Sequence, residues 1–136
     1  MSKAFTLEST YVNLRPDDSA TALKVGPRFW ATIEKRADLG DGRLMGAVAQ
    51  KADWSHWERH PGGDEILTLL SGEMDMLSGE MDIVLETRAG ERRTRLKAGQ
   101  TFVVPRGVWH RGLVRKPGKL MFITPGAGTD HRSVAL

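Results

Sequence analysis

The sequence contains no cysteine, which excludes a disulfide framework, a thiolate zinc site and a cysteine nucleophile. It also contains no apolar run near the roughly 18 residues that a membrane-spanning helix needs. Its N-terminus, MSKAFTLEST, lacks the long apolar stretch of a secretory signal. We therefore expect a cytoplasmic protein that does not use a membrane.

Dense blocks of a single charge are also missing. The net charge of +3 and the isoelectric point near 9.5 raise the question of nucleic-acid binding. The basic residues are dispersed, however, and acidic residues lie among or near them. Neither a basic helix nor an alternation of aromatic and basic residues is present. The charge pattern favours a solvated surface of mixed sign and no nucleic-acid partner.

The 136 residues are enough for one domain with a sizeable core and too few to suggest two. Residues 1–42 are expected to form an N-terminal extension, with a strand at Thr10–Leu14 (TYVNL) and a short helix over residues 27–37 (PRFWATIEKRA). Pro27 would occupy the first helical position, and Phe29, Trp30 and Ile33 would share one face. We interpret this helix as packing against the core.

From residue 43 onward, short apolar and β-branched runs alternate with Gly- and Pro-containing turns. This pattern favours an all-β sandwich or barrel, since no strand-helix-strand alternation indicates a parallel sheet. The strands are predicted at Arg43–Gln50, Trp54–His60, Glu65–Leu70, Met81–Thr87, Arg92–Lys97, Thr101–Val104, Val108–Arg115 and Leu120–Thr124. A tandem repeat, LSGEMDM (70–76) and LSGEMDI (77–83), is interpreted as a local duplication accommodated in a hairpin.

The stretch HWERHPGGDE (56–65) is unusually rich in groups that can bind a cation. In a strand, His56, Glu58 and His60 point to one face, and a hairpin after Pro-Gly-Gly would bring Glu65 to the same side. Burying imidazoles and carboxylates without partners is costly. These side chains should therefore be solvated, paired with one another, or bound to a metal ion.

A second segment, GQTFVVPRGVWH (99–110), is a hydrophobic strand followed by a turn and His110. Taken with the first, it resembles the second of the two motifs of the cupin superfamily: Gly99, five residues, Pro105, one residue, Gly107, two residues and His110. The first motif is matched by His60, a four-residue gap, Glu65, six residues and Gly72. The first motif usually begins with a histidine two residues before its second one, and that place is Glu58 here.

The resemblance implies a double-stranded β-helix, or jelly-roll, barrel over residues 43–125 and a C-terminal tail over residues 126–136. It also implies that one divalent metal ion (Fe, Mn, Ni or Zn) is bound inside the barrel. Mixed imidazole and carboxylate ligands suit all four metals. The implied ligands are Glu58, His60, Glu65 and His110. The alternative is a metal-free cupin in which the glutamates pair with the histidines or with Arg106.

The implied function is a metalloenzyme, of dioxygenase or isomerase type, acting on a small organic molecule, with Glu58 as a candidate catalytic base. The alternative is a binding or sensing cupin without turnover, because one fold serves both roles. We expect the substrate to contact His56, Trp54, Leu67, Phe102 and Val108. We also expect a homodimer formed through the apolar N-terminal stretch TLESTYVNL together with Phe29 and Trp30.

The tail TPGAGTDHR (124–132) also resembles that of small bacterial cupins. Terminal segments more often pack or dimerise than carry chemistry, so Asp130 and His131 are left outside the predicted site.

Overall fold

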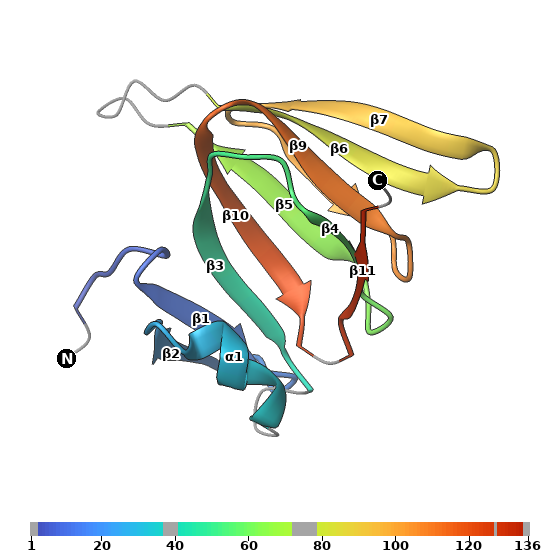
Figure 1. Ribbon diagram of the computed structural model, residues 1–136. Helices are drawn as coiled ribbons and strands as arrows, with labels where there is room; N and C mark the ends of the chain where they lie inside the picture. Colours follow the sequence, from blue (N-terminus) through green and yellow to red (C-terminus); the bar gives the residue numbers. More distant parts are fainter. Residues whose placement is uncertain (1–2, 37–40, 72–78, 127, 135–136) are drawn as a thin grey trace.

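The structure is a computed structural model that describes residues 3–36, 41–71, 79–126 and 128–134. Within these ranges the chain forms two antiparallel sheets and little helix, so the prediction of an all-β, double-stranded β-helix fold is confirmed (Figure 1). The first sheet, with strand order β2-β1-β3-β10-β5-β8, contains β1 (Thr10–Leu14), β2 (Ala20–Lys24), β3 (Arg43–Gln50), β5 (Glu65–Leu70), β8 (Thr101–Val104) and β10 (Gly118–Pro125).

The second sheet has the strand order β11-β4-β9-β6-β7. Its strands are β4 (His56–Arg59), β6 (Glu80–Thr87), β7 (Gly90–Lys97), β9 (His110–Lys116) and β11 (Asp130–Ser133). Every strand predicted from residue 43 onward is present, with ends that differ by a few residues. Two strands, β2 and β11, were not predicted.

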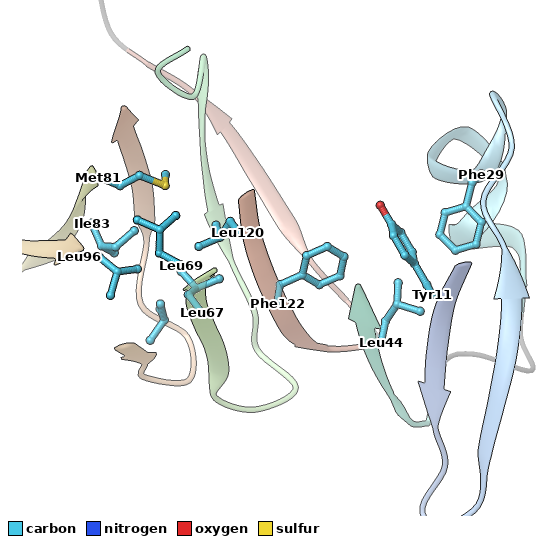
Figure 2. Close-up of a cluster of buried hydrophobic side chains, with 11 residues drawn as sticks. Tyr11, Phe29, Leu44, Leu67, Leu69, Met81, Ile83, Leu96, Leu120 and Phe122 are labelled. Carbon is cyan, nitrogen blue, oxygen red and sulfur yellow. The ribbon is translucent and has the colours of Figure 1, made fainter. Parts of the chain in front are cut away.

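The core lies between the sheets and follows the alternation of side chains along each strand. In β5, Glu65, Leu67 and Leu69 are buried, while the residues between them are only partly buried. Burying a leucine side chain contributes about 1.5 to 3 kcal/mol. Figure 2 shows the cluster continuing from Met81, Ile83 and Leu96 through Leu67, Leu69 and Leu120 to Phe122, Leu44, Tyr11 and Phe29.

The N-terminal residues complete this core. Tyr11 packs edge-on against both Phe29 and Phe122, with ring centroids 5.1 and 5.4 Å apart. Gly46 permits this contact, since a Cβ at that position would lie 2.5 Å from the Tyr11 ring. The aromatic residues expected to bind a second chain are therefore largely used within this one, although the side chain of Trp30 is 53% exposed.

The helix is shorter than predicted. An α-helical turn, α1 (Phe29–Thr32), continues into a 3₁₀ turn, η1 (Ile33–Lys35), instead of one helix starting at Pro27. No side chain caps its N-terminus, and Thr32 hydrogen-bonds back to the carbonyl of Arg28. Consecutive β-branched residues at Thr32 and Ile33 also lower helix propensity.

The duplicated segment falls partly outside the described residues. Gly72 and the remainder of residues 72–78 are not described, so the predicted role of Gly72 is not tested. The second copy continues as β6, where Met81 and Ile83 are fully buried. Gly79, just before β6, packs on Gly118, and a Cβ there would lie 2.9 Å from the Gly118 Cα. In the described part of the chain, no helix is long and apolar enough to cross a membrane.

Candidate metal centre

The four predicted ligands come from three strands that belong to both sheets. Glu58 on β4 is the cross-strand partner of His110 on β9, so the two lie side by side. Glu65 is the first residue of β5 and projects inward from the opposite sheet. His60 follows β4 directly. Ligand atoms of these four residues all lie within 4.8 Å of one another.

Two turns hold the strands in this arrangement. The backbone amide of Gly107 donates a hydrogen bond of 3.0 Å to the carbonyl of His60. Gly107 has a φ of +74°, which glycine adopts without the strain of a side chain. The neighbouring Arg106 amide donates to the Asp64 carboxylate at 2.7 Å, and the Arg106 Nε donates to the carbonyl of Pro61. The PGGD and PRG turns thus fasten the two motifs together. Arg106 does not pair with a ligand glutamate.

The Glu65 carboxylate lies between the two histidines. Its Oε1 is 3.0 Å from His110 Nε2, and its Oε2 is 3.1 Å from His60 Nε2. All three side chains are buried, His110 completely. Thr124 on β10 donates its hydroxyl to Glu65 Oε2 at 2.5 Å. The carboxylate is therefore fixed from both sheets.

Each imidazole uses its other nitrogen to fix its orientation. His110 Nδ1 is 3.1 Å from the carbonyl of Val108, which can only accept, so Nδ1 carries a proton. His60 Nδ1 is 3.0 Å from the Thr129 hydroxyl. Both Nε2 atoms therefore point at Glu65. If His110 were neutral, its Nε2 lone pair would face a carboxylate, so a proton or a metal ion must lie between them.

The pKa values of Glu65 and His110 describe the case in which a proton, and not a metal ion, lies between them. Burial raises the pKa of Glu65, but the imidazoles of His110 and His60 outweigh it and lower that pKa to about 2. Burial lowers the pKa of His110, but the hydrogen bond with Glu65 outweighs it, so the net pKa is raised. Without a metal ion, both pKa shifts favour the pairing of an imidazolium with a carboxylate.

The donor set fits a metal ion. Among the described residues, the buried His60 Nε2 has no hydrogen-bond partner of good geometry, although Glu65 Oε2 lies 3.1 Å away. A buried polar atom without a partner is rare and calls for an explanation. Histidine ligands usually bond their second nitrogen to a carbonyl or a similar group, as both do here. The orientation of His60 Nε2 therefore fits that of a metal ligand.

Glu58 differs from the other three ligands. Its side chain is 24% exposed, and its Oε2 is 3.8 Å from His60 Nε2. Its Oε1 faces outward, 3.2 Å from His56 Nε2. The structure therefore places Glu58 at the rim of the centre, between the buried ligands and His56.

The predicted substrate-contacting residues occupy different positions. Phe102 and Val108 line a cavity of about 740 Å³, which also borders Leu85, the cross-strand partner of His110. Leu67 lies in the core, and Trp54 packs near His110 while its indole nitrogen donates to Gln50. Leu67 and Trp54 do not border this cavity. The substrate contacts remain predictions.

Three further residues that the sequence did not predict contact the metal centre. Thr124 and Thr129 orient Glu65 and His60, and threonines in strands or tails give no signal of such a role. His131 Nε2 is 3.7 Å from Glu58 Oε1 because β11 pairs with β4. The sequence of β11, DHRS, lacks the apolar alternation that would predict a strand.

The fold and this constellation define a double-stranded β-helix protein with a histidine–glutamate cluster in its barrel. The model of the cupin domain family matches residues 45–124, more than half of the chain. The protein belongs to the cupin family.

One solved structure with a TM-score of 0.50 supports this fold, and two others are similar to a lesser degree. An uncharacterized conserved protein with a double-stranded β-helix domain from Klebsiella pneumoniae is 20% identical, with a TM-score of 0.50 over 68% of this chain and 76% of that chain. A cupin-2 domain protein from Shewanella frigidimarina is 23% identical, with a TM-score of 0.48 over 61% and 70%. An oxalate oxidase is 18% identical, with a TM-score of 0.49 over 64% and 44%. At such identities the likeness concerns the fold alone. No curated protein matches this sequence.

Proposed function

We propose that this protein is a cytoplasmic cupin metalloenzyme that acts on a small organic molecule through one divalent ion held by Glu58, His60, Glu65 and His110. The observation that carries the proposal is the convergence of two buried imidazole Nε2 atoms on one buried carboxylate, with both Nδ1 atoms engaged elsewhere. Two nitrogen and two oxygen ligands suit Fe(II), Mn(II), Ni(II) or Zn(II).

The bound ion would polarise a substrate oxygen or, if it is iron, support reaction with dioxygen, as in a dioxygenase or an isomerase. The chain supplies the surroundings. Glu58 is the ligand nearest to solvent, and its carboxylate is the candidate base that would take a proton from a bound molecule. The cavity lined by Leu85, Phe102 and Val108 has the volume of a small-molecule site, although none of the four ligands lines it. Arg88, Arg92 and Arg93 line it and favour a substrate with an anionic group.

A second candidate is a binding or sensing cupin without turnover, metal-bound or metal-free. It is favoured by the hydrogen bonds that Glu65 receives from His110 and Thr124, which satisfy the carboxylate without an ion. The two candidates differ in what the site does with a metal. An enzyme needs an ion with an open coordination position, whereas a closed four-ligand tetrahedron serves structure.

The test is the metal content of untagged protein purified without chelator and desalted before analysis. We expect about one tightly held ion per chain, and its loss in His110→Ala and His60→Ala, since each removes an imidazole from a four-ligand set. Glu91→Gln, a change at an exposed position on β7, is the matched control and should keep the ion. Wild-type protein that takes up no Fe(II), Mn(II), Ni(II) or Zn(II) would exclude the enzyme proposal.

If an ion is retained, Co(II) substitution distinguishes the two functions. Visible absorption of four-coordinate Co(II) that does not change with added small anions indicates a closed site. A spectrum that shifts as anions are titrated in indicates an open position. The first result would favour the binding protein and the second the enzyme.

A further inference from the structure

Beyond the buried centre, we propose that His56, Glu58 and His131 form a second, outer metal site that takes a divalent ion of the zinc class. The two oxygens of Glu58 face different groups. Its Oε2 faces His60 of the buried centre, whereas its Oε1 is 3.2 Å from His56 Nε2 and 3.7 Å from His131 Nε2. Glu58 would bridge the two sites, but the outer site requires none of the other buried ligands and does not depend on the proposed function.

The fold brings these three residues together from opposite ends of the sequence. His56 and Glu58 lie two residues apart on β4, so they point to the same face of the sheet. β11 pairs antiparallel with β4 and sets His131 directly opposite Glu58. The imidazole rings of His56 and His131 lie 5.2 Å apart, on the same side as the Glu58 carboxylate. All four histidines of the chain belong to one cluster or the other.

The spacing of the ligand atoms matches metal coordination. Bonds of about 2.0 to 2.1 Å separate neighbouring ligand atoms by roughly 3.0 Å in an octahedron and roughly 3.3 Å in a tetrahedron. The separations of 3.2 and 3.7 Å lie near these values, and the ligand atoms of the trio are all within 4.8 Å of one another. A small movement of His131 would complete a His₂Glu site.

The rival explanation is a solvated trio held by one hydrogen bond between His56 and Glu58. It accounts for the 3.2 Å contact but gives His131 no hydrogen bond to Glu58, since 3.7 Å is too long. The nearest cation of β4, Arg59, is bound by Asp130 on the opposite face, at 2.6 Å, and does not compete for Glu58. Within the described part of the chain, the groups facing Glu58 Oε1 are these two imidazoles.

The outer site differs from the buried centre in its access to solvent. The side chains of His56 and His131 are 41% and 51% exposed. An ion there would therefore exchange readily and keep coordination positions open to water or to an anion. It would also hold Glu58 Oε1, which leaves Oε2 as the oxygen directed at the buried centre.

The experiment is equilibrium dialysis of the full chain against buffered free Zn(II), with metal measured in both compartments. We expect wild-type protein to bind about two ions, one of which is lost on desalting, and His131→Ala and His56→Ala to bind about one. Ser133→Ala, on the same strand as His131 and opposite His56 in the pairing, is the control and should still bind about two. Circular dichroism checks that each variant is folded.

Two further variants separate the sites. His110→Ala should lose the tightly held ion and keep the labile one. Glu58→His offers one nitrogen in place of two oxygens, so it should keep the buried ion and lose the labile one. If His131→Ala, His56→Ala and Ser133→Ala all bind as much Zn(II) as the wild type, the outer site does not exist. Loss of only the desalting-resistant ion in His131→Ala would also overturn it, because His131 would then serve the buried centre.

Discussion

Replacing Glu65 by glutamine should remove the charge at the middle of the site while keeping its shape, and its effect on stability can be worked out from the structure. The folded pKa of about 2 lies below the ordinary value of 4.5. A depressed carboxylate pKa stabilises the fold at pH values above 4.5, and this stability is lost as the pH falls from 4.5 toward 2. The difference corresponds to roughly 3 kcal/mol.

His110 sets the upper pH limit of the stabilisation that the pair provides. Its pKa is raised above 6.5, mainly because the favourable contact with Glu65 outweighs burial. A raised imidazole pKa stabilises the fold below pH 6.5, and this stability is lost as the pH rises through the folded value. Metal-free protein should therefore gain most from the pair between about pH 4.5 and 6.5. Glu65→Gln leaves His110 without a counter-ion, so that gain should disappear.

The assay is urea unfolding in the presence of a chelator from pH 3 to pH 8. At pH 5.5, Glu65→Gln should be less stable than wild type by roughly 3 kcal/mol, which lowers the urea midpoint by about 1 to 3 M. Its stability should rise less steeply between pH 3 and pH 5 than that of the wild type, because only carboxylates such as Asp82, whose pKa is lowered by Arg115 and Arg95, still contribute. The exposed Glu91→Gln is the control and should follow the wild-type curve. Equal midpoints for wild type and Glu65→Gln at pH 5.5 would refute the assigned ion pair.

Three other predictions concern the scaffold. Deleting residues 71–77 removes one repeat copy and keeps Gly79 and all of β6, so urea unfolding should stay cooperative, with stability changed by about 1 kcal/mol or less. Asp64→Ala removes the acceptor for the Arg106 amide and should cost about 1 kcal/mol in the same assay. Light scattering at micromolar concentration should give a dimer, and Trp30→Ser, at the most exposed aromatic described, should shift it toward the 15.1 kDa monomer. A monomeric wild type would contradict the dimer.

The barrel could be predicted from the sequence because its signals are local. In β5, EILTLL is a short, mostly apolar run that follows the Pro-Gly-Gly turn, which predicts a strand, and Gly107 marks a turn that requires a positive φ. β2 (ATALK) and β11 (DHRS) could not be predicted in the same way. Their side chains are mostly exposed, so edge pairing and not burial determines their strand conformation. Such pairing depends on the rest of the sheet.

The metal centre also contains residues that local sequence signals predict and residues that only long-range contacts bring into place. His60, Glu65 and His110 have fixed spacings within two short motifs, so the sequence predicts which residues they are, and the fold brings them within 4.8 Å. Thr124 and Thr129 orient two of these ligands, yet they are separated from them by 59 and 69 residues. A local sequence pattern cannot predict a hydrogen bond between a hydroxyl group and a residue that is so far away in the chain. The orienting residues therefore emerge only from the three-dimensional arrangement.

The structure gives a physical reason for the glutamate at position 58, where the motif usually has a histidine. It stands where the resemblance leads one to expect a histidine, and the sequence alone presents this as a change of ligand for one ion. In the structure, β11 brings His131 opposite Glu58, and His56 approaches from the same face. A histidine can offer one nitrogen to one neighbour, whereas a carboxylate has two oxygens that can serve two. The exchange is thus suited to a position between two groups of histidines, and its consequence depends on an edge strand that the local pattern did not predict.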